Sequence, residues 1–517
     1  PYNLYTTENV KKKFISIDEC IDCCKKQFDY NNIGKDINEL EQKEFINKFL
    51  YNCKRWNCID NNKIDILEYS SKYCKMDCEV LSKGYNKFKQ SIKTITGLNI
   101  NNFISLASIA DTYMLKKGVY KDVYKVNGIA REFIQKCMVG GRTMTADNKK
   151  HIIDRFLDDF DAVSLYPSAM ERLGGYLKGL PKVLTNLSYD FLKSVDGYFI
   201  EIKIKEVNKN YKFPLMSFKT DEGIRNFTNN MIDRIIYVDK IQLEDLIKFH
   251  KIKFEIIKGY YYDEGRNPFV KETITYLFNE RVKQKKLNNP IQNVYKLLMN
   301  SAYGKTLLKP IENETKYITK DNEEEYISKY FDYIKEYEEL PNGVDIKIKQ
   351  YKTINDHYNN CICGIEVLSM SKRIMNEVMC LAEDNNIPLY YQDTDSIHLP
   401  TDKVNTLSKL FDEKYNRQLI GEGTGQFHTD FELNGAKDIY AEKSIFLGKK
   451  CYIDCLVGKD KDDNDVKGFH IRMKGIPTKS VLYEAKQLNL TPLDLYEKMY
   501  KGEGVSFDLL KGLDNEG

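Results

Sequence analysis

The stretch "LYYQDTDSIHLP", residues 389–400, places two carboxylates two positions apart in an otherwise apolar and aromatic run. The flanking residues predict two short strands joined by a tight turn that carries Asp393 and Asp395. Two negative charges this close repel, which usually raises the pKa of one carboxyl. A divalent cation removes that cost, because hard cations such as magnesium take oxygen ligands. The alternative is an ordinary surface turn, since Asp and Thr are common in turns.

A second stretch, "DDFDAVSLYPSAM" at residues 158–170, predicts an apolar strand that ends at Asp161. A turn follows at residues 164–166, and Pro167 is expected to open a helix, where proline is tolerated. The backbone N–H groups at the start of a helix can bind a phosphate, and a carboxylate beside them can bind the metal ion that accompanies it. The alternative is a strand-to-helix turn without a ligand.

The third stretch, "KLLMNSAYGK" at residues 296–305, predicts a helix that places Lys296 and Asn300 on one face. With Tyr303 and Gly304 nearby, this face offers a cation, an amide, an aromatic ring and space for a close approach. Such a set can hold a nucleoside triphosphate and stack its base. The alternative is a helix that ends at Gly304 as a C-cap. Two upstream residues, also four apart, add positive charge: Arg281 and Lys285.

In this order the three stretches resemble the palm and fingers of family B DNA polymerases, as "DxxSLYPS", "KxxxNSxYG" and "YxDTDS". Three further segments fit the resemblance. "GGR" at residues 140–142 is similar to the linker motif that contacts template. "KKCY" at 449–452 is similar to the motif that holds the primer end, and "HIRMKGIP" at 470–477 is similar to the segment leading into the thumb.

The resemblance implies an α+β multidomain fold, a right-hand polymerase with palm, fingers and thumb and a remnant of an N-terminal RNase H-like exonuclease domain. The expected segments are an incomplete C-terminal part of the 3′–5′ exonuclease domain at 1–110, a linker with the GGR motif at 111–150, palm with a first insertion at 151–265, fingers at 266–305, a second insertion at 306–360, palm again at 361–477 and a thumb, expected to be truncated, at 478–517. Within the second insertion, the acidic run at 321–339 is expected to be a solvated helix face.

The expected exonuclease remnant carries only the last of that domain's three carboxylate motifs, as "YCKMD" with Tyr73 and Asp77. The other two motifs would lie upstream of Pro1. A chain that starts at Pro rather than Met is expected to be a fragment or a processed product. Proofreading activity is therefore not expected of this chain.

The resemblance also assigns roles to individual residues. It implies two magnesium ions about 3.5–4 Å apart, with manganese as a substitute. The expected catalytic residues are Asp161, Asp393 and Asp395, and the expected metal ligands are Asp161, Val163 and Asp395. The expected dNTP-binding residues are Ser164, Leu165, Tyr166, Arg281, Lys285, Lys296 and Asn300, with Tyr166 under the sugar, where it excludes a 2′-hydroxyl. The expected DNA-binding residues are Gly140, Gly141, Arg142, Tyr303, Gly304, Thr394, Ser396, Lys450, Tyr452 and Lys474.

The long spacer between the first two motifs and the large second insertion are similar to those of protein-primed polymerases of phages, linear plasmids, virophages and Polinton-type elements. This subgroup implies template-directed DNA synthesis from dNTPs onto a primer 3′-hydroxyl, in replication of a viral or mobile-element genome. The implied partners are primer-template DNA, dNTPs and a terminal priming protein. The alternative is an inactive or truncated relic that only binds DNA or the primer protein. A reverse transcriptase or RNA polymerase would lack the SLYPS turn, and a nuclease would need the upstream carboxylates.

Composition is that of an ordinary globular protein of several structural units: 517 residues, 30% charged and 42% hydrophobic. No run approaches the roughly 18 apolar residues of a membrane span, so no membrane partner is expected. A net charge of +3 argues neither for nor against nucleic acid.

Thirteen cysteines predict free thiols in a reducing compartment inside a cell, either host cytoplasm or a viral replication site, or a mitochondrion for a linear plasmid. Cys20 and Cys23 have the spacing that can begin a zinc site. Cys53 and Cys58 lack the matching spacing, however, and no His lies nearby.

Overall fold

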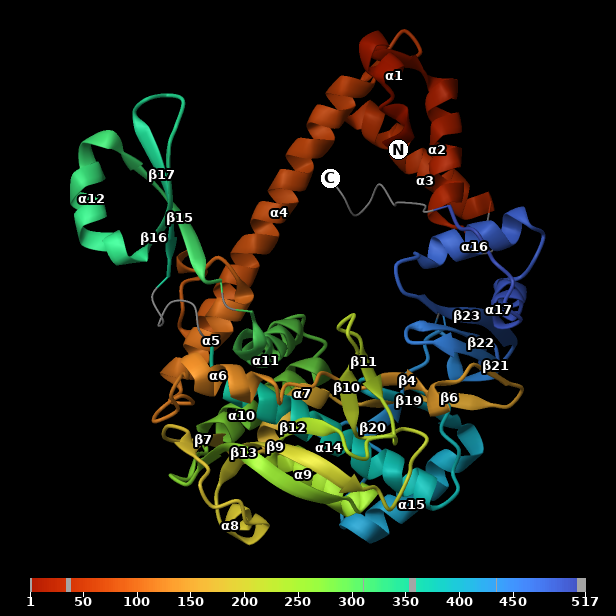
Figure 1. Ribbon diagram of the computed structural model, residues 1–517. Helices are drawn as coiled ribbons and strands as arrows, with labels where there is room; N and C mark the ends of the chain where they lie inside the picture. The colour runs from red at the N-terminus through yellow and green to blue at the C-terminus, as the bar shows by residue number, and fades with distance from the viewer. Residues whose placement is uncertain (1, 34–38, 310, 353–358, 434, 509–517) are drawn as a thin grey trace. The chain divides into compact units, whose positions relative to one another are not determined.

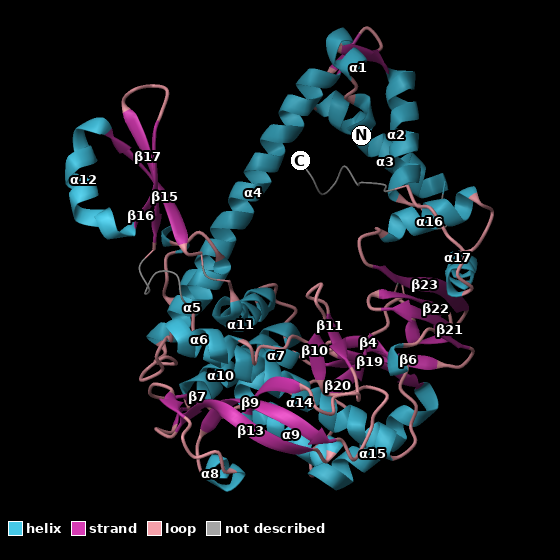
Figure 2. Ribbon diagram, in the orientation of Figure 1, coloured by secondary structure: helices cyan, strands magenta, loops and turns pink. Residues whose placement is uncertain are grey.

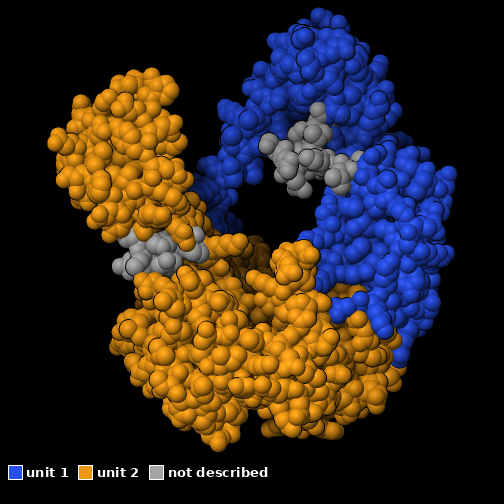
Figure 3. All heavy atoms as spheres, viewed as in Figure 1, with its two compact units in different colours: residues 1–95, 148–158, 431–517 blue, residues 96–147, 159–430 orange. Residues whose placement is uncertain are grey.

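The computed structural model describes residues 2–33, 39–309, 311–352, 359–433 and 435–508 (Figure 1). The chain divides into two compact units, which Figure 3 shows in blue and orange. Unit 1 consists of residues 1–95, 148–158 and 431–517, and unit 2 of residues 96–147 and 159–430.

The N-terminal part of unit 1 is mostly helical. A small antiparallel sheet of order β1-β3-β2 accompanies the helices. Cys20, Cys24 and Cys53 are buried in its core beside Phe49 and Ile64. Burial raises the pKa of Cys24 to about 11 and that of Cys20 and Cys53 to about 12, so these thiols serve as small apolar residues. The elements are η1 (Tyr2–Leu4), α1 (Thr7–Lys12), β1 (Phe14–Ser16), α2 (Ile17–Asn31), α3 (Glu39–Arg55), β2 (Ile59–Asp60), β3 (Lys63–Asp65) and α4 (Ile66–Thr96).

The C-terminal part of unit 1 is an antiparallel sheet followed by two helices. Strand β22 lies between β21 and β23, and β5 pairs with β21. Ile445, Ile453, Ile471 and Tyr496 form the core between sheet and helices. The elements are β5 (His151–Ile153), β21 (Lys437–Gly448), β22 (Cys451–Lys459), β23 (Asp465–Met473), α16 (Thr478–Gln487) and α17 (Pro492–Tyr500).

Unit 2 contains a four-stranded antiparallel sheet of order β12-β9-β13-β8. Its strands coincide with the β-rich runs of residues 180–265. Alternate residues of β9, such as Ile200 and Ile202, are buried together with Val238 and Leu243. Tyr262 is buried in β13. The elements are β7 (Tyr176–Leu177), β8 (Lys182–Val183), α8 (Tyr189–Lys193), β9 (Gly197–Glu206), β10 (Ser217–Lys219), β11 (Arg225–Phe227), β12 (Ile235–Asp239), α9 (Lys240–Asp245), η4 (Leu246–His250), β13 (Lys253–Tyr262) and β14 (Arg266–Asn267).

Two helices in unit 2, α10 (Phe269–Lys286) and α11 (Gln292–Leu307), are separated at Pro290. Pro290 accounts for this separation, because a proline inside a helix removes a backbone hydrogen bond. Helix α11 packs against α10, α5 and α14. The remaining elements outside the insertion and the catalytic sheet are η2 (Ile100–Asn102), α5 (Leu106–Lys116), α6 (Gly128–Gln135), η3 (Ala146–Asn148), α14 (Cys361–Asp384), η7 (Thr401–Lys403) and α15 (Val404–Tyr415).

The second insertion is a three-stranded antiparallel sheet of order β15-β17-β16 with one helix (Figure 2). The prediction of one helix face over residues 321–339 is wrong in its second half. Strand β16 pairs there with the alternating sequence of β17, and Lys347–Glu338 and Lys349–Glu336 ion pairs, each 2.8 Å, join the two strands. The elements are β15 (Asn313–Thr319), η5 (Lys320–Asn322), α12 (Glu323–Tyr330), η6 (Phe331–Tyr333), β16 (Ile334–Glu339) and β17 (Asp345–Tyr351).

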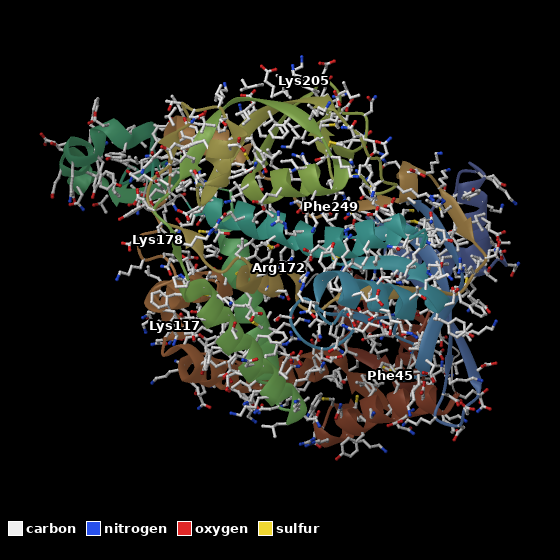
Figure 4. The ribbon with its side chains drawn as sticks, turned by 90° about the horizontal axis from the view of Figure 1, so that it is seen from below. Phe45, Lys117, Arg172, Lys178, Lys205 and Phe249 are labelled. Atoms are coloured by element: carbon white, nitrogen blue, oxygen red, sulfur yellow. The ribbon has the colours of Figure 1, made fainter. Side chains whose placement is uncertain are left out.

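Helix α14 runs through the core of unit 2 and is buried over most of its length. It nevertheless carries several charged side chains, and most of them pair with an opposite charge from another segment. Glu366 pairs with Arg266 at 2.7 Å, and Arg373 with Asp245 at 2.7 Å. Glu377 accepts from Arg172 at 2.6 Å and from Arg417 at 2.5 Å; Figure 4 labels Arg172. The pairing is needed because an unpaired buried charge is costly.

Replacing Glu377 with Ala should lower the free energy of unfolding by about 2–3 kcal/mol. Losing one partner of a buried pair costs about 3–5 kcal/mol, and the expected loss is smaller because Arg172 and Arg417 can partly reach water. Urea denaturation followed by circular dichroism would measure it. The matched control is Glu413→Ala on the exposed face of α15, which should change stability by less than about 0.5 kcal/mol. Equal midpoints for the two variants would contradict the structural role of Glu377.

No helix in the described ranges combines the length and the apolar character that crossing a membrane requires.

Candidate active site

The two carboxylates of the opening motif and the carboxylate of the second stretch meet on one sheet of unit 2. Its strands, in order, are β6 (Leu157–Ala162), β19 (Ser396–Pro400), β18 (Tyr391–Asp393) and β4 (Thr143–Thr145), and β20 (Phe427–Thr429) pairs with β6. The Ala162 N–H donates to the Asp395 carbonyl at 2.8 Å. This bond places Asp161, on β6, next to Asp395, in the turn that leads into the neighbouring strand β19.

The predicted hairpin at residues 389–400 is confirmed, and its turn is tight. Thr394 adopts φ of +61°, and the Asp395 N–H donates to the Asp393 carbonyl at 2.7 Å. Asp393 and Ser396 face each other across the turn. The Thr143 hydroxyl donates to the Asp393 carboxylate at 3.1 Å, so Asp393 is oriented by the neighbouring strand β4.

The environment of Asp161 is strongly acidic. Partial burial, followed by the negative charge of Asp395, raises the pKa of Asp161 to about 8. Asp430 and Asp159 act in the same direction, and His428, its cross-strand partner on β20, acts in the opposite direction. His428 and Asp430 were not predicted. The only sequence signal for them is the alternation in "FHTDF", residues 427–431.

The donor set fits magnesium. Mg²⁺ is usually held by one or two carboxylates together with substrate phosphates and water, and facing carboxylates are stabilised by a cation between them. Among the described residues, no group of three or more His, Cys, Asp or Glu side chains lies close enough to form a complete metal cage. Asp161 and Asp395 would therefore supply part of a coordination shell. The Val163 carbonyl, the third predicted ligand, accepts from the buried Ser168 hydroxyl at 2.9 Å.

Gly141 and Arg142 of the linker motif pack against this hairpin. The Thr394 N–H donates to the Arg142 carbonyl at 2.9 Å. The Arg142 guanidinium is 3% exposed and donates to Gln392 and to the carbonyls of Phe213 and Pro214. A template contact by the Arg142 side chain, as predicted, conflicts with this burial. Instead, Arg142 holds strand β18 in place.

Gly141 is required by its distance to the hairpin. A Cβ at this position would lie 2.5 Å from Thr394 Cγ2, whereas a Cβ at Gly140 would meet no atom within 4 Å. Gly141→Ala should therefore displace the turn between Asp393 and Asp395 and lower nucleotide incorporation about 10- to 100-fold, because small displacements at a reacting centre are costly. Gly140→Ala is the matched control, with an expected change below about threefold. Single-turnover incorporation compares the two, and equal rates would contradict the role of Gly141.

The turn after Asp161 is held by side chains. Ser164 caps helix α7 (Leu165–Arg172) in the left-handed conformation, with φ of +47°. The Ser168 hydroxyl donates to the Val163 carbonyl and accepts from the Gly425 N–H at 2.9 Å. The helix begins at Leu165, so Pro167 lies within the first turn and does not open the helix as predicted. Leu165 itself is buried.

Several predicted nucleotide and DNA contacts come together beside this turn. Arg281 on α10 donates to the Ser164 hydroxyl at 2.7 Å. The rings of Tyr166 and Tyr303 stack with centroids 4.0 Å apart and planes 15° apart. The structure therefore brings the second and third stretches together around Tyr166.

Other predicted residues of α11 face solvent. Lys296 and Asn300 are exposed one turn apart. Gly304 lies inside the helix, which continues to Leu307, so the C-cap alternative is wrong. Lys285 on α10 pairs with Glu422 at 3.0 Å. Ser396 is buried at the start of β19, which leaves its side chain little surface for a DNA contact.

The remaining predicted residues belong to unit 1. Lys450 lies in the β21–β22 turn with φ of +56°, and its carbonyl accepts from the Lys474 N–H at 2.9 Å. Tyr452 is 3% exposed and packs against Phe446 and His470. Its predicted DNA contact conflicts with this burial. Tyr73 and Asp77 are exposed on α4.

Paired carboxylates on a sheet, beside two helices that carry cations and a stacked tyrosine, are typical of the palm and fingers of a right-hand polymerase. The chain belongs to the family of organellar and viral type B DNA polymerases, whose family model matches residues 4–384.

Curated relatives agree with this family. A DNA polymerase of Kluyveromyces lactis is 23% identical over 88% of this chain and 44% of its own length. A probable DNA polymerase of Ascobolus immersus is 24% identical over 82% of this chain and 32% of its own. The chain thus spans less than half the length of these relatives.

The fold is that of solved polymerase structures. Phi29 DNA polymerase complexed with primer-template DNA and incoming nucleotide substrates aligns with a TM-score of 0.51 and 17% identity, over 75% of this chain and 62% of that chain. The same polymerase with primer-template DNA alone gives 0.50 and 16% over the same shares. The α+β multidomain, right-hand polymerase fold is thereby confirmed.

Proposed function

We propose that this chain carries out template-directed DNA synthesis by transferring a nucleotidyl group from a dNTP to a primer 3′-hydroxyl. The observation that carries the proposal is the placement of Asp161 beside Asp395 by the hydrogen bond between Ala162 on β6 and Asp395 in the β18–β19 turn. Phosphoryl transfer depends mainly on positioning and on neutralising charge. A pair of aligned carboxylates next to a cationic helix pair supplies both requirements.

Asp161 and Asp395 would hold two divalent ions, magnesium or manganese, with the Val163 carbonyl as a further ligand. Bound there, the ions would activate the primer hydroxyl and stabilise the leaving pyrophosphate. Asp393 is oriented by Thr143 and supports the hairpin.

Residues of α7, α10 and α11 would bind the nucleotide. Arg281, Lys285 and Lys296 would bind the triphosphate, and Tyr166 would lie under the sugar. Asn300, Tyr303 and Gly304 would contact the nascent base pair. Thr394 would hold primer phosphates, which gives register without sequence preference. Lys450 and Lys474 would bind DNA on unit 1.

The palm, fingers, thumb and exonuclease boundaries predicted from the sequence are part of this proposal. The proposal also includes priming by a terminal protein, which the large second insertion supports. It further includes action within a reducing intracellular compartment. Phi29 DNA polymerase, whose fold the chain shares, was solved with primer-template DNA and nucleotides, the same partners proposed here. The intact Asp161, Lys296, Asp393 and Asp395 argue against a relic that only binds DNA.

Primer extension tests the proposal. The chain, incubated with a singly primed DNA template, magnesium and dNTPs, should lengthen the primer in template order. DNA binding is measured in parallel by fluorescence anisotropy. Intact DNA binding with no extension would favour the binding-only alternative.

A further inference from the structure

The loop of residues 421–426, "GEGTGQ", reaches between the catalytic sheet and α10. We refer to it as the glycine loop. Its Glu422 accepts from Lys285 Nζ at 3.0 Å. The hydrogen bond from Lys285 holds the pKa of Glu422 below its usual value, and the charges of His428 and Arg281 act in the same direction. Glu422 therefore lies among cations that belong to the proposed triphosphate site.

The position of the glycine loop is fixed by bonds to the second stretch. The Gln426 carbonyl accepts from the Val163 N–H at 2.8 Å, and the Gly425 N–H donates to Ser168 at 2.9 Å. The Gln426 side chain closes the loop by accepting from the Gly423 N–H at 2.7 Å. A Cβ at Gly421 would lie 2.2 Å from Gln426 Oε1 and would displace this side chain from its bond to Gly423. Glu422 is therefore held on a structured loop anchored beside Asp161.

Arg281 has donor capacity left for a ligand. Its guanidinium donates to Ser164 at 2.7 Å, while its Nε–H is buried without a hydrogen-bond partner in the described part of the chain. Buried donors normally have partners. Lys285, in contrast, already has an anionic partner. Arg281 and Lys285 therefore form a cationic site, and the Glu422 carboxylate neutralises part of its positive charge.

We propose that Glu422 is a stand-in for phosphate that the incoming triphosphate must displace from Lys285, next to the Arg281 guanidinium. This inference rests on the proposed function, because it takes these two residues as triphosphate ligands. A highly charged triphosphate can bind both the Arg281 guanidinium and the Lys285 ammonium, and it competes well with the single carboxylate of Glu422. An anion with less charge competes poorly. Glu422 thereby weakens the binding of pyrophosphate and nucleoside diphosphates and selects for the triphosphate.

The test replaces Glu422 with Gln, which keeps the shape and removes the charge. The Kd of a fluorescent dNTP, measured by equilibrium titration, should fall about two- to fivefold, the range expected for releasing one exposed ion pair. The Kd of pyrophosphate should fall by a larger factor than the Kd of the dNTP, because Glu422 is proposed to weaken pyrophosphate binding more. In primer extension, the KM for dNTP should fall while kcat stays within about twofold of wild type.

Two further variants test whether the fall in Kd comes from releasing Lys285 or from a general loss of negative charge. Glu280→Gln removes a carboxylate that pairs with Lys283 on the same helix and should leave the Kd of both ligands unchanged. In a Lys285→Ala background, Glu422→Gln should have less than half its original effect, because its main partner is gone.

An unchanged or higher dNTP Kd in Glu422→Gln, or an equal effect of Glu280→Gln, would overturn the inference. If the wild type failed to extend primers, the proposed function would fail, and the Kd comparison would still decide the role of Glu422.

Discussion

An Asp395→Asn variant is expected to lose nucleotide incorporation by at least about a thousandfold while it still binds primer-template DNA. The expectation follows from the geometry, because Asp395 lies in the hairpin turn beside Asp161 and both face the same acidic site. Removing one of two carboxylates would remove a metal ligand and the charge balance that phosphoryl transfer needs. Asp161→Asn should behave in the same way. Single-turnover incorporation and DNA anisotropy measure the two quantities.

The matched control is Asp430→Asn, which removes a negative charge that acts on Asp161 from the exposed end of β20. Its incorporation rate should fall by less than about tenfold, since it would change the field without removing a ligand. A comparable loss in Asp430→Asn and Asp395→Asn would contradict the assignment of Asp395 as a ligand. Retained synthesis by Asp395→Asn would contradict the proposed active site.

Discrimination against ribonucleotides is expected to fall in a Tyr166→Val variant. The Tyr166 ring is held in place by stacking on Tyr303 with centroids 4.0 Å apart, so it cannot move aside easily to admit a 2′-hydroxyl. Steric overlap of one extra group costs about 1–3 kcal/mol, which corresponds to about 5- to 150-fold in selectivity. Incorporation of dNTP and rNTP under competition would give the ratio of the two kcat/KM values.

Tyr166→Phe is the control for this experiment, because it keeps the ring and removes only the hydroxyl. It should retain at least half of the wild-type discrimination. If valine and phenylalanine gave the same ratio, the ring would not be the discriminating group. If both variants kept the wild-type ratio, sugar selection would reside elsewhere.

Much of the site could be predicted because its residues lie in short segments whose local structure is strongly determined. The alternating run at 389–400 and the "DTD" turn predict the hairpin, and the apolar strand before Asp161 predicts β6. Their pairing follows from the family resemblance. Pro290 predicts the break between α10 and α11, since the reason is local.

The errors concern side chains whose environment depends on distant parts of the chain. Arg142 is buried because Phe213, Pro214 and Gln392 surround it, which no local pattern reveals. Tyr452 is buried between strands in the same way. The role of the glycine loop could not be predicted from sequence, because Glu422 pairs with Lys285, which lies 137 positions earlier in the chain. Strand β16 looked helical because its partner β17 decides its conformation.

The charged side chains of α14 have a consequence for how related sequences can diverge. Each of its ion pairs joins this helix to a segment remote in sequence, as Glu366 does with Arg266 and Arg373 with Asp245. Loss of one member is costly, whereas joint replacement by apolar residues of similar volume can be neutral. Positions 366 and 266, and positions 373 and 245, should therefore covary in an alignment of close homologues. Such covariation would report the packing of this helix rather than the chemistry at Asp161 and Asp395.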